Sequence, residues 1–344
     1  MLTLVPGRHG GSETYARELL RGLSRVGTLS YRVYLPPTAR DAAEGLPAEV
    51  VEEYPAGRSA RRRLSAMALA LARPAPLRAR FAAADVVHYP FTIALPRVRS
   101  PGVVTLHDLQ HVDLPRLFSR AERAFRAVAY NRSARRARLV IVPSAFVRDR
   151  AVELLGLDPT RVRVIPHGVD HALFSPGSAD REGFLLYPAR HWPHKNHERL
   201  FEALALLRAE RPGLRLVLTG GGHSGAVPDG VETRGHVSAD ELASLYRRAS
   251  ALVFPSLYEG FGQPPLEAMA CGCPVACSDA ASLPEVCGDA ARYFHPDDPR
   301  QIAAAVLDVL SDPDEWSRRG LARAAMFTWD TSAKAHEDVY RELL

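Results

Sequence analysis

The chain has 344 residues, of which 47% are hydrophobic and 24% are charged. This composition is typical of a soluble globular protein and excludes a disordered, fibrous or disulfide-rich chain. The length predicts two domains, each large enough to bury a core.

Charge is distributed unevenly along the chain. Residues 1–175 contain 27 arginines, no lysine and 15 acidic residues, a net charge of +12, whereas residues 176–344 contain 17 basic and 24 acidic residues, a net charge of −7; the two sum to +5. This asymmetry indicates that the two halves meet different partners.

The cysteines and the apolar runs limit the site types and the compartment. All four cysteines lie within seventeen residues, at positions whose spacing matches neither paired zinc ligands nor a disulfide framework: Cys271, Cys273, Cys277 and Cys287. We therefore expect reduced thiols in a cytoplasmic protein and no metal. No stretch approaches the ~20 apolar residues of a membrane span, so any membrane contact is expected to be peripheral.

Strand and helix patterns alternate through the first half, which predicts an α/β domain with a doubly wound parallel sheet. Apolar runs predict strands at residues 2–5, 31–35, 86–89, 103–106, 139–142 and 162–165. Amphipathic patterns predict helices at residues 11–26, 59–73, 120–136 and 145–155.

The same alternation resumes after a linker at residues 166–177. Strands are predicted at residues 184–187, 214–218, 252–254 and 274–277, and helices at 197–208, 239–248, 265–270, 299–310 and from 313 to the end. The expected domains are 1–168 and 169–325, both Rossmann-like, with a C-terminal helix at 326–344 that packs back on the first domain. Ligand sites at the carboxyl ends of both sheets would face each other across a cleft.

A strand, a glycine-bearing loop and a helix follow one another at residues 251–270. Gly260 and Gly262 allow a ligand to approach the backbone, and a helix that begins beside Pro264 favours an anion at its N-terminus. Glu259 and Glu267 frame this loop with seven residues between them. Carboxylates accept hydrogen bonds from hydroxyl groups, so a nucleotide sugar would satisfy both features. The alternative is two surface acids near a turn.

These residues carry a family resemblance. Glu259, Gly260, Phe261 and Gly262, with the runs at 266–270 and 272–275, resemble the signature of the family 4 glycosyltransferases, which are retaining enzymes of the GT-B fold that use nucleotide-activated sugars. The runs at 282–286 and 288–291 are similar to the bacterial mannosyltransferase-like branch that builds O-antigen and other surface polysaccharides.

The resemblance implies further site residues. The Gly10-Gly11 turn resembles the turn that offers amides to the donor phosphate or the acceptor, although such a turn is equally typical of plain structure. His107 follows a predicted strand and is similar to the active-site histidine, and Arg190 and Lys195 resemble a cationic diphosphate clamp. Such a clamp neutralises the charge of a departing diphosphate without a metal.

The resemblance therefore predicts a retaining hexosyltransferase that moves mannose from GDP-mannose to a lipid-linked or oligosaccharide acceptor in cell-surface polysaccharide synthesis. The expected catalytic residues are His107, Arg190, Lys195 and Glu259; the expected substrate-binding residues are Gly10, Gly11, Gly260, Phe261, Gly262 and Glu267. No cofactor, metal or nucleic acid is expected. The alternatives are a nucleotide-sugar epimerase of the same fold and a non-catalytic nucleotide-sugar-binding partner subunit.

Two expectations concern the first half. Seven arginines flank an apolar run at 66–72, which predicts contact with an anionic membrane surface on the inner face of the cell membrane; a solvated basic face is the alternative. These are Arg58, Arg61, Arg62, Arg63, Arg73, Arg78 and Arg80. The predicted first strand is at the short limit for a central parallel strand, so we expect the true start codon to lie upstream of Met1.

Overall fold

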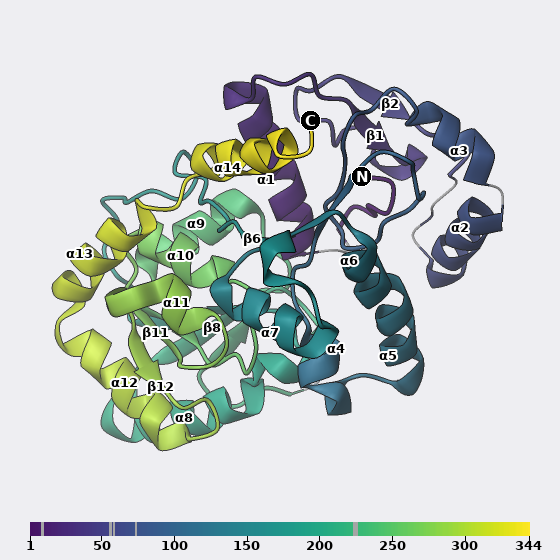
Figure 1. Ribbon diagram of the computed structural model, residues 1–344. Helices are drawn as coiled ribbons and strands as arrows, with labels where there is room; N and C mark the ends of the chain where they lie inside the picture. The colour runs from purple at the N-terminus through teal and green to yellow at the C-terminus, as the bar shows by residue number, and fades with distance from the viewer. Residues whose placement is uncertain (8–9, 55–56, 58, 73, 223–225) are drawn as a thin grey trace. The chain divides into compact units, whose positions relative to one another are not determined.

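The computed structural model describes residues 1–7, 10–54, 57, 59–72, 74–222 and 226–344 (Figure 1). The chain divides into two compact units, Met1–Gly168 with Trp329–Leu344, and Val169–Thr328. Both are α/β units whose strand pairs are all parallel.

The first unit has two parallel sheets. Four strands pair in the order β3 (Val87–Tyr89), β4 (Gly102–Thr105), β5 (Leu139–Val142) and β6 (Val162–Val164), and β1 (Val33–Leu35) pairs with β2 (Ala48–Val50). Its helices are α1 (Gly11–Val26), α2 (Ala60–Ala72), α3 (Pro74–Arg80), α4 (Gln110–Asp113), α5 (Arg120–Arg126), α6 (Arg132–Arg136), α7 (Ala145–Leu155) and α14 (Trp329–Arg341). Every residue of β5 is buried, as expected for a parallel strand covered on both faces.

The predicted strand at residues 2–5 is wrong. The segment forms a turn in which the Leu4 N–H donates to the Met1 carbonyl at 3.0 Å. Leu2, Leu4 and Val5 are buried all the same, so the apolar run reflects burial and not a strand ladder. Four residues ahead of a proline offer few backbone groups for a ladder. A cavity of about 630 Å³ lies beside this segment, lined also by residues of β1 and β3.

The other departures from the sequence prediction are local. Strand β2 and helix α3 were not predicted, and the helix expected at 120–136 contains a π-helical segment, Ala127–Asn131, between α5 and α6. The helix expected from residue 313 to the end is two helices, α13 (Pro313–Ala324) and α14. The chain leaves the second unit between them and returns to the first at Trp329.

Helix α14 packs directly on α1 in the first unit. Gly22 allows this approach, because a Cβ atom there would lie only 2.9 Å from the Cβ of Ala333 and 2.9 Å from the carbonyl oxygen of Trp329. At the start of α14, the indole of Trp329 stacks on the buried ring of His167, with ring centres 5.8 Å apart. The C-terminal helix is therefore part of the core of the first unit.

The second unit contains one six-stranded parallel sheet with the strand order β12-β11-β10-β7-β8-β9. The strands are β7 (Phe184–Pro188), β8 (Arg215–Thr219), β9 (Val231–Thr233), β10 (Ala251–Phe254), β11 (Val275–Ser278) and β12 (Arg292–Phe294). The helices besides α13 are α8 (His197–Glu210), α9 (Ala239–Arg248), α10 (Gln263–Ala270), α11 (Leu283–Cys287) and α12 (Pro299–Ser311). Strands β9 and β12 were not predicted.

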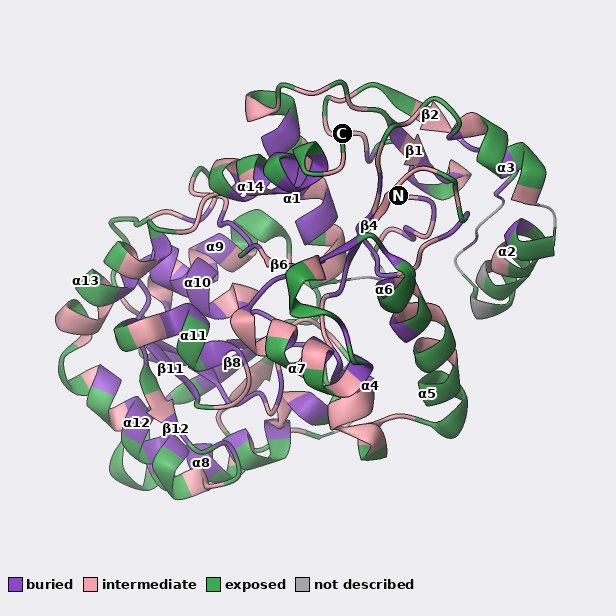
Figure 2. Cartoon of the chain, viewed as in Figure 1, coloured by how far each residue is buried: buried purple, intermediate pink, exposed green. Residues whose placement is uncertain are grey.

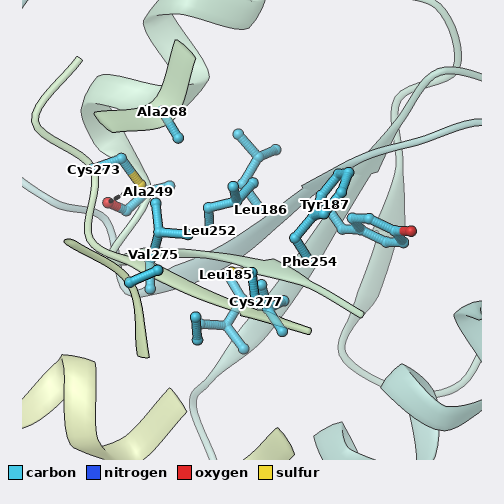
Figure 3. Close-up of a cluster of buried hydrophobic side chains, with 14 of the residues drawn as sticks. Leu185, Leu186, Tyr187, Ala249, Leu252, Phe254, Ala268, Cys273, Val275 and Cys277 are labelled. Carbon is cyan, nitrogen blue, oxygen red and sulfur yellow. Dashed lines mark hydrogen bonds between the residues drawn. The ribbon is translucent and has the colours of Figure 1, made fainter. Parts of the chain in front are cut away.

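The central strands of this sheet form a dry apolar core (Figure 3). Leu185 and Leu186 of β7, Leu252 of β10 and Val275 of β11 have no exposed surface. Cys273 belongs to this core, and its thiol lies 3.9 Å from the Ala249 carbonyl. All four cysteines are buried and unbridged, as expected from their spacing. This rigid core fixes the loops that leave the carboxyl ends of β7, β8 and β10.

A buried polar chain connects α14 to α1. The His336 Nδ1 lies 2.7 Å from the Ser332 carbonyl, which can only accept, so Nδ1 carries the proton. Burial lowers the pKa of His336 to about 4, so the ring is neutral near pH 7 and its Nε2 accepts from the Tyr15 hydroxyl at 2.7 Å. The Tyr15 oxygen then accepts from the Thr105 hydroxyl at 2.8 Å.

The chain of hydrogen bonds continues through His88 of β3 and returns to α14. Because the Thr105 proton is already donated, its oxygen accepts from the His88 Nε2–H at 2.8 Å. The Nδ1 of His88 then accepts from the Tyr340 hydroxyl at 2.8 Å. Burial also holds the pKa of His88 well below its usual value. Each proton of the chain therefore has one assigned place, and both histidines must stay neutral.

The first prediction concerns this polar chain. The folded-state pKa of His336, about 4, lies below the ordinary value of 6.5, so the unfolded chain binds more protons between these values. Stability should fall as pH drops from about 6.5 toward 4, and His336 alone should account for about 2 kcal/mol between pH 7 and pH 5. His336→Gln should be less stable than wild type at pH 7 but lose less on acidification. Parallel thermal melts at both pH values measure this; an equal loss in both proteins would contradict it.

Candidate active site

The loop after β7 carries two of the predicted cations. Arg190 lies two residues beyond the strand, and its guanidinium is 5.6 Å from the ring centre of the half-exposed Trp192. Lys195 ends a 3-10 turn, Pro193–Lys195, and the Tyr187 hydroxyl donates to its carbonyl at 2.6 Å. Asn196, in the left-handed region at φ 59°, ties this loop to the carbonyls of Pro255 and Pro296.

The structure joins Lys195 to Glu259, which is 64 residues away in the sequence. The Lys195 Nζ donates to the Glu259 Oε1 at 2.5 Å, and the Ser256 hydroxyl donates to the same oxygen at 2.5 Å. Both charged side chains are only about one-seventh exposed, at 14% and 15%. A partly desolvated pair of this kind is stronger than an exposed surface pair. Lys195 and Glu259 thus form one ion pair at the carboxyl ends of β7 and β10.

The loop after β10 is shaped by Gly260, Phe261 and Gly262. Gly262 adopts φ 112°, and a Cβ there would meet the Leu283 Cδ2 at 2.8 Å, so glycine is required for two reasons. Phe261 is buried, 5% exposed. The Ser282 hydroxyl lies 2.9 Å from the Glu259 carbonyl and 2.7 Å from that of Phe261. The Ser282 hydroxyl thus contacts the backbone of the loop at two positions.

Helix α10 begins at Gln263, two residues before the predicted start at residue 265, and its N-terminus offers an anion fewer backbone donors than a typical helix does. Pro264 and Pro265 occupy its first turn and have no N–H group. Among the N-cap residue Gly262 and the first three residues of the helix, only Gly262 and Gln263 carry a backbone N–H. An anion at this edge would therefore depend on the side-chain cations more than on the helix end.

Glu267 lies one turn into α10 and is 8% exposed. The Tyr246 hydroxyl donates to its Oε2 at 3.3 Å, and Gln263 also hydrogen-bonds to it. Burial raises the pKa of Glu267 to about 8, more than these hydrogen bonds lower it. A hydroxyl-rich ligand that donates to the carboxylate would therefore promote loss of this proton on binding.

The glycine run after β8 belongs to the same edge. A Cβ at Gly220 would lie 2.8 Å from the backbone carbon of Ala189, and Gly220 adopts φ 100°. The His191 N–H donates to the Gly221 carbonyl at 3.2 Å. Gly220 thereby lets the β8 loop pack against the backbone beside Arg190. This close approach is the structural reason for a glycine at position 220.

Among the predicted residues of the first unit, His107 lies beyond the carboxyl end of a strand of its sheet. His107 follows β4 and is half-buried; its Nε2 lies 2.7 Å from the Pro90 carbonyl and therefore carries the proton. Its ring meets that of Tyr15 edge-on at 5.0 Å. The side chain is held in a fixed orientation by the same tyrosine that belongs to the buried polar chain.

Gly10 and Gly11 are exposed at the start of α1. Gly10 is the N-cap residue, with φ 53° and ψ −129°, and a Cβ at either glycine would meet nothing within 4 Å. The open space leaves the backbone accessible to a ligand, and only Gly10 needs glycine for its conformation. Arg8 and His9, the residues before this turn, lie outside the described part of the chain.

His167 is a residue that the sequence placed only in the linker. It is buried between Tyr15, at a ring distance of 4.8 Å, and Trp329, and its ring centre lies 6.2 Å from that of His107. It belongs to the packing around His107. No sequence signal distinguished it, because its neighbours come from α1, β4 and the last helix.

The described ranges contain neither a metal-binding cluster nor a membrane-spanning helix. No group of three or more His, Cys, Asp or Glu side chains there could hold a metal ion. No helix in these ranges combines the length and hydropathy that crossing a bilayer requires.

Comparison with known proteins identifies the class of enzyme. Residues 170–325 match the family described as Glycosyl transferases group 1, and residues 9–173 match Glycosyltransferase Family 4. With its two parallel α/β units, the protein has the GT-B fold of glycosyltransferases, which confirms the predicted fold class. The chain belongs to the family 4 glycosyltransferases. The expected cleft between the units stays a prediction.

Curated relatives and solved structures agree with this assignment. The chain is 32% identical over 286 residues to O-antigen chain mannosyltransferase B of Escherichia coli, covering 75% of each chain. It is 33% identical to the MMP alpha-(1->4)-mannosyltransferase of Mycolicibacterium hassiacum, over 60% of this chain and 54% of that one. Sucrose-phosphate synthase from Thermosynechococcus elongatus has the same fold, with a TM-score of 0.79 at 21% identity, covering 97% and 94% of the two chains.

A further structural neighbour is Anabaena HepE in complex with UDP-glucose, with a TM-score of 0.74 at 19% identity and coverage of 99% and 98%. At this identity the likeness extends to the fold alone.

The second prediction concerns the Lys195–Glu259 pair. A diphosphate that binds Lys195 must compete with Glu259, so removing that negative charge should strengthen binding of a free nucleoside diphosphate. Glu259→Gln should bind GDP about fivefold more tightly or better, a gain of ~1 kcal/mol from lost repulsion. Calorimetric titration measures it. Glu232→Gln, at a partly exposed acid on β9, is the matched control. Weaker GDP binding by Glu259→Gln would show that Glu259 does not oppose the diphosphate.

The third prediction concerns Glu267. Because its folded-state pKa is about 8, most of the protein holds it protonated at pH 7. If ribose hydroxyls donate to the carboxylate, GDP affinity should rise about tenfold as pH increases from 7 to above 8.5, with proton release on binding. Glu267→Gln should bind more weakly and show a smaller pH dependence. Titrations in buffers of different ionisation enthalpy count the released protons; equal pH profiles for both proteins would contradict this role.

Proposed function

We propose that the protein is a retaining hexosyltransferase that moves mannose from GDP-mannose to a lipid-linked or oligosaccharide acceptor in cell-surface polysaccharide synthesis. The observation that carries the proposal is the pairing of Lys195 with Glu259 at the edge where Arg190 and Glu267 also lie. The mannosyltransferase names of the similar E. coli and M. hassiacum proteins support the choice of sugar.

In this proposal the bond between the anomeric carbon and the diphosphate oxygen breaks, and the acceptor hydroxyl oxygen bonds to the anomeric carbon. The acceptor proton passes to the departing diphosphate. Negative charge grows on the phosphate oxygens, and Arg190 and Lys195 neutralise it. Such preorganised cations stabilise the transition state more than the ground state.

Glu259 is assigned to the donor sugar and not to nucleophilic attack. Its Oε1 accepts from Lys195 and from Ser256, and the hydrogen bond from Ser256 still lowers the nucleophilicity of this oxygen when Lys195 is released. When a diphosphate takes over Lys195, the carboxylate becomes able to accept a sugar hydroxyl and to stabilise positive charge at the anomeric carbon. Retention then follows from attack on the face from which the diphosphate leaves.

The remaining assignments follow the two sheet edges. Glu267 binds the ribose, and the loop of Gly260, Phe261 and Gly262 lets the donor approach the backbone. In the first unit, His107 hydrogen-bonds to the transferred sugar, and the exposed amides at Gly10 and Gly11 face a phosphate or the acceptor. The protein works on the cytoplasmic side, and the reaction needs no metal because the cations are side chains.

The fourth prediction tests the reaction. With a long-chain alkyl α-mannoside as acceptor, GDP-mannose should give an α-linked product and free GDP, whereas UDP-glucose and ADP-glucose should not. The rate should survive EDTA. Arg190→Ala should lower kcat about a hundredfold, ~3 kcal/mol, with a smaller effect on donor binding. The product is analysed by NMR for anomeric configuration.

The control for this assay is Arg211→Gln, an exposed arginine of the second unit, which should leave the rate unchanged. A β-linked product would contradict retention. An isomerised donor formed without acceptor would identify an epimerase instead. Wild-type turnover in Arg190→Ala would contradict the role of Arg190 in neutralising the departing diphosphate. A loss of rate in EDTA that Mg²⁺ restores would contradict metal independence.

A further inference from the structure

A groove of about 1060 Å³ runs along the first unit between α2, the loop that precedes β4, and the α5–α6 segment. This volume is slightly above the ~300–1,000 Å³ typical of small-molecule sites. Many of the residues along α2 and α5 are exposed (Figure 2). The groove takes no part in the proposed transfer and raises the question of what it binds.

All of the charged residues that line the groove are basic. Seven arginines line it, together with no acidic residue of the described chain: Arg97, Arg99, Arg132, Arg135, Arg136, Arg138 and Arg161. None of the seven forms an ion pair with a carboxylate among the described residues. By contrast, Arg80 outside the groove pairs with both Glu49 and Glu53.

The arginines also repel one another. Partial burial, followed by the positive charges of Arg136, Arg132 and Arg78, lowers the pKa of Arg97. Like charges held together without a counter-charge favour a bound anion, because the anion removes the repulsion. Arg97, Arg132 and Arg136 all line the groove, and we assign a bound anion to these three side chains.

The rest of the groove is apolar and partly open to solvent. Leu64, Met67 and Leu71 of α2 line one wall at helical spacing, and Phe125 and Val128 line the opposite wall. Leu64, Leu71 and Val128 are 54%, 59% and 63% exposed, which is unusual for large apolar side chains gathered on one surface. Such a surface is stabilised when a hydrocarbon chain covers it.

Basic and apolar residues follow one another along the same helical face. Phe125 and Val128 lead directly to Arg132 and Arg136 at spacings of three and four residues. A ligand that lies along this face would meet hydrocarbon first and positive charge next. Nucleic acid would contact the arginines but would leave the long apolar wall uncovered. An acidic peptide would leave this wall uncovered as well.

We propose that this groove binds an anionic phospholipid of the membrane surface, with the lipid phosphate at Arg97, Arg132 and Arg136 and an acyl chain against Leu64, Leu71 and Val128. Arginine suits this task because its guanidinium binds phosphate in a bidentate manner. The groove holds the first unit on the membrane.

The groove is separate from the proposed reaction centre within the first unit. Gly102, Arg138 and Arg161, at the amino ends of β4, β5 and β6, line it, whereas His107 follows the carboxyl end of β4. The groove shares the apolar run of the predicted membrane segment through Met67, Ala68 and Leu71, but its arginines are not the seven that the sequence singled out. Arg80 of that segment is neutralised by its ion pairs, and Arg78 donates to the Arg97 carbonyl at 2.8 Å. Arg58 and Arg73, and the side chain of Arg63, lie outside the described part of the structure.

Co-sedimentation of the whole chain with vesicles tests the proposal as a fifth prediction. Vesicles of phosphatidylcholine with added phosphatidylglycerol should bind the protein at low salt, and phosphatidylcholine alone should not. Arg132→Gln with Arg136→Gln should weaken binding about 25-fold, at about fivefold for each arginine. Leu64→Ser with Leu71→Ser and Val128→Ser, which keeps every charge, should weaken it at least about tenfold.

Two controls separate the groove from general charge and from folding. Arg211→Gln with Arg300→Gln removes the same charge from exposed positions of the second unit and should bind vesicles nearly as wild type does. All variants should bind GDP as wild type does, which reports on folding of the second unit, and should keep the wild-type melting profile.

Three results would overturn the proposal. The first is wild-type vesicle binding by either groove variant, and the second is equal binding to neutral vesicles. The third is displacement from vesicles by soluble glycerol phosphate, which would show a phosphate site without a lipid chain. Transfer to the alkyl mannoside is measured separately, so failure of the lipid site and failure of the proposed reaction are distinguishable.

Discussion

The ion pair between Lys195 and Glu259 depends on one constraint of parallel sheets, which is that every strand ends at the same edge. β7 and β10 are neighbours in the sheet, so the loops that follow them meet although they are far apart in the sequence. The Leu257 N–H donates to the His194 carbonyl at 2.8 Å, which ties the two loops together a few residues from the pair. Charge can be held at this edge because the core beneath it is fully buried.

The Lys195–Glu259 pair also suits a ligand that carries both an anionic group and hydroxyl groups, because each member of the pair can bind one of them. Without a ligand, each neutralises the other at low exposure, which limits the cost of burying two charges. A nucleotide sugar carries both a diphosphate and hydroxyl groups, so it can replace each partner of the pair with a group of its own. In the proposed reaction the same exchange brings Lys195 to the leaving group and Glu259 to the sugar.

The first unit uses polar burial in a different way. Its chain of neutral hydrogen bonds runs from Tyr340 through His88, Thr105 and Tyr15 to His336, and its members come from α14, α1, β3 and β4. The last helix is therefore required for the environment of His107. The basic groove at the opposite edge of this sheet contrasts with that order, because its arginines pair with no carboxylate among the described residues and Leu64 and Leu71 are exposed.

The sequence by itself determined the α/β class, most element positions and the chemical character of the site. Helices α1 and α7 and strand β5 lie where their patterns predicted, because periodicity and capping are local properties. The two glutamates, the glycine loop and the clamp were recognisable as motifs.

Only the tertiary structure decided that residues 2–5 form no strand, because pairing depends on neighbours that a short segment must reach. It alone decided that Lys195 pairs with Glu259, that burial raises the pKa of Glu267 to about 8, and that His167 packs near His107. Ion pairing, desolvation and ring contacts depend on distances between distant parts of the chain, and no local pattern encodes those distances.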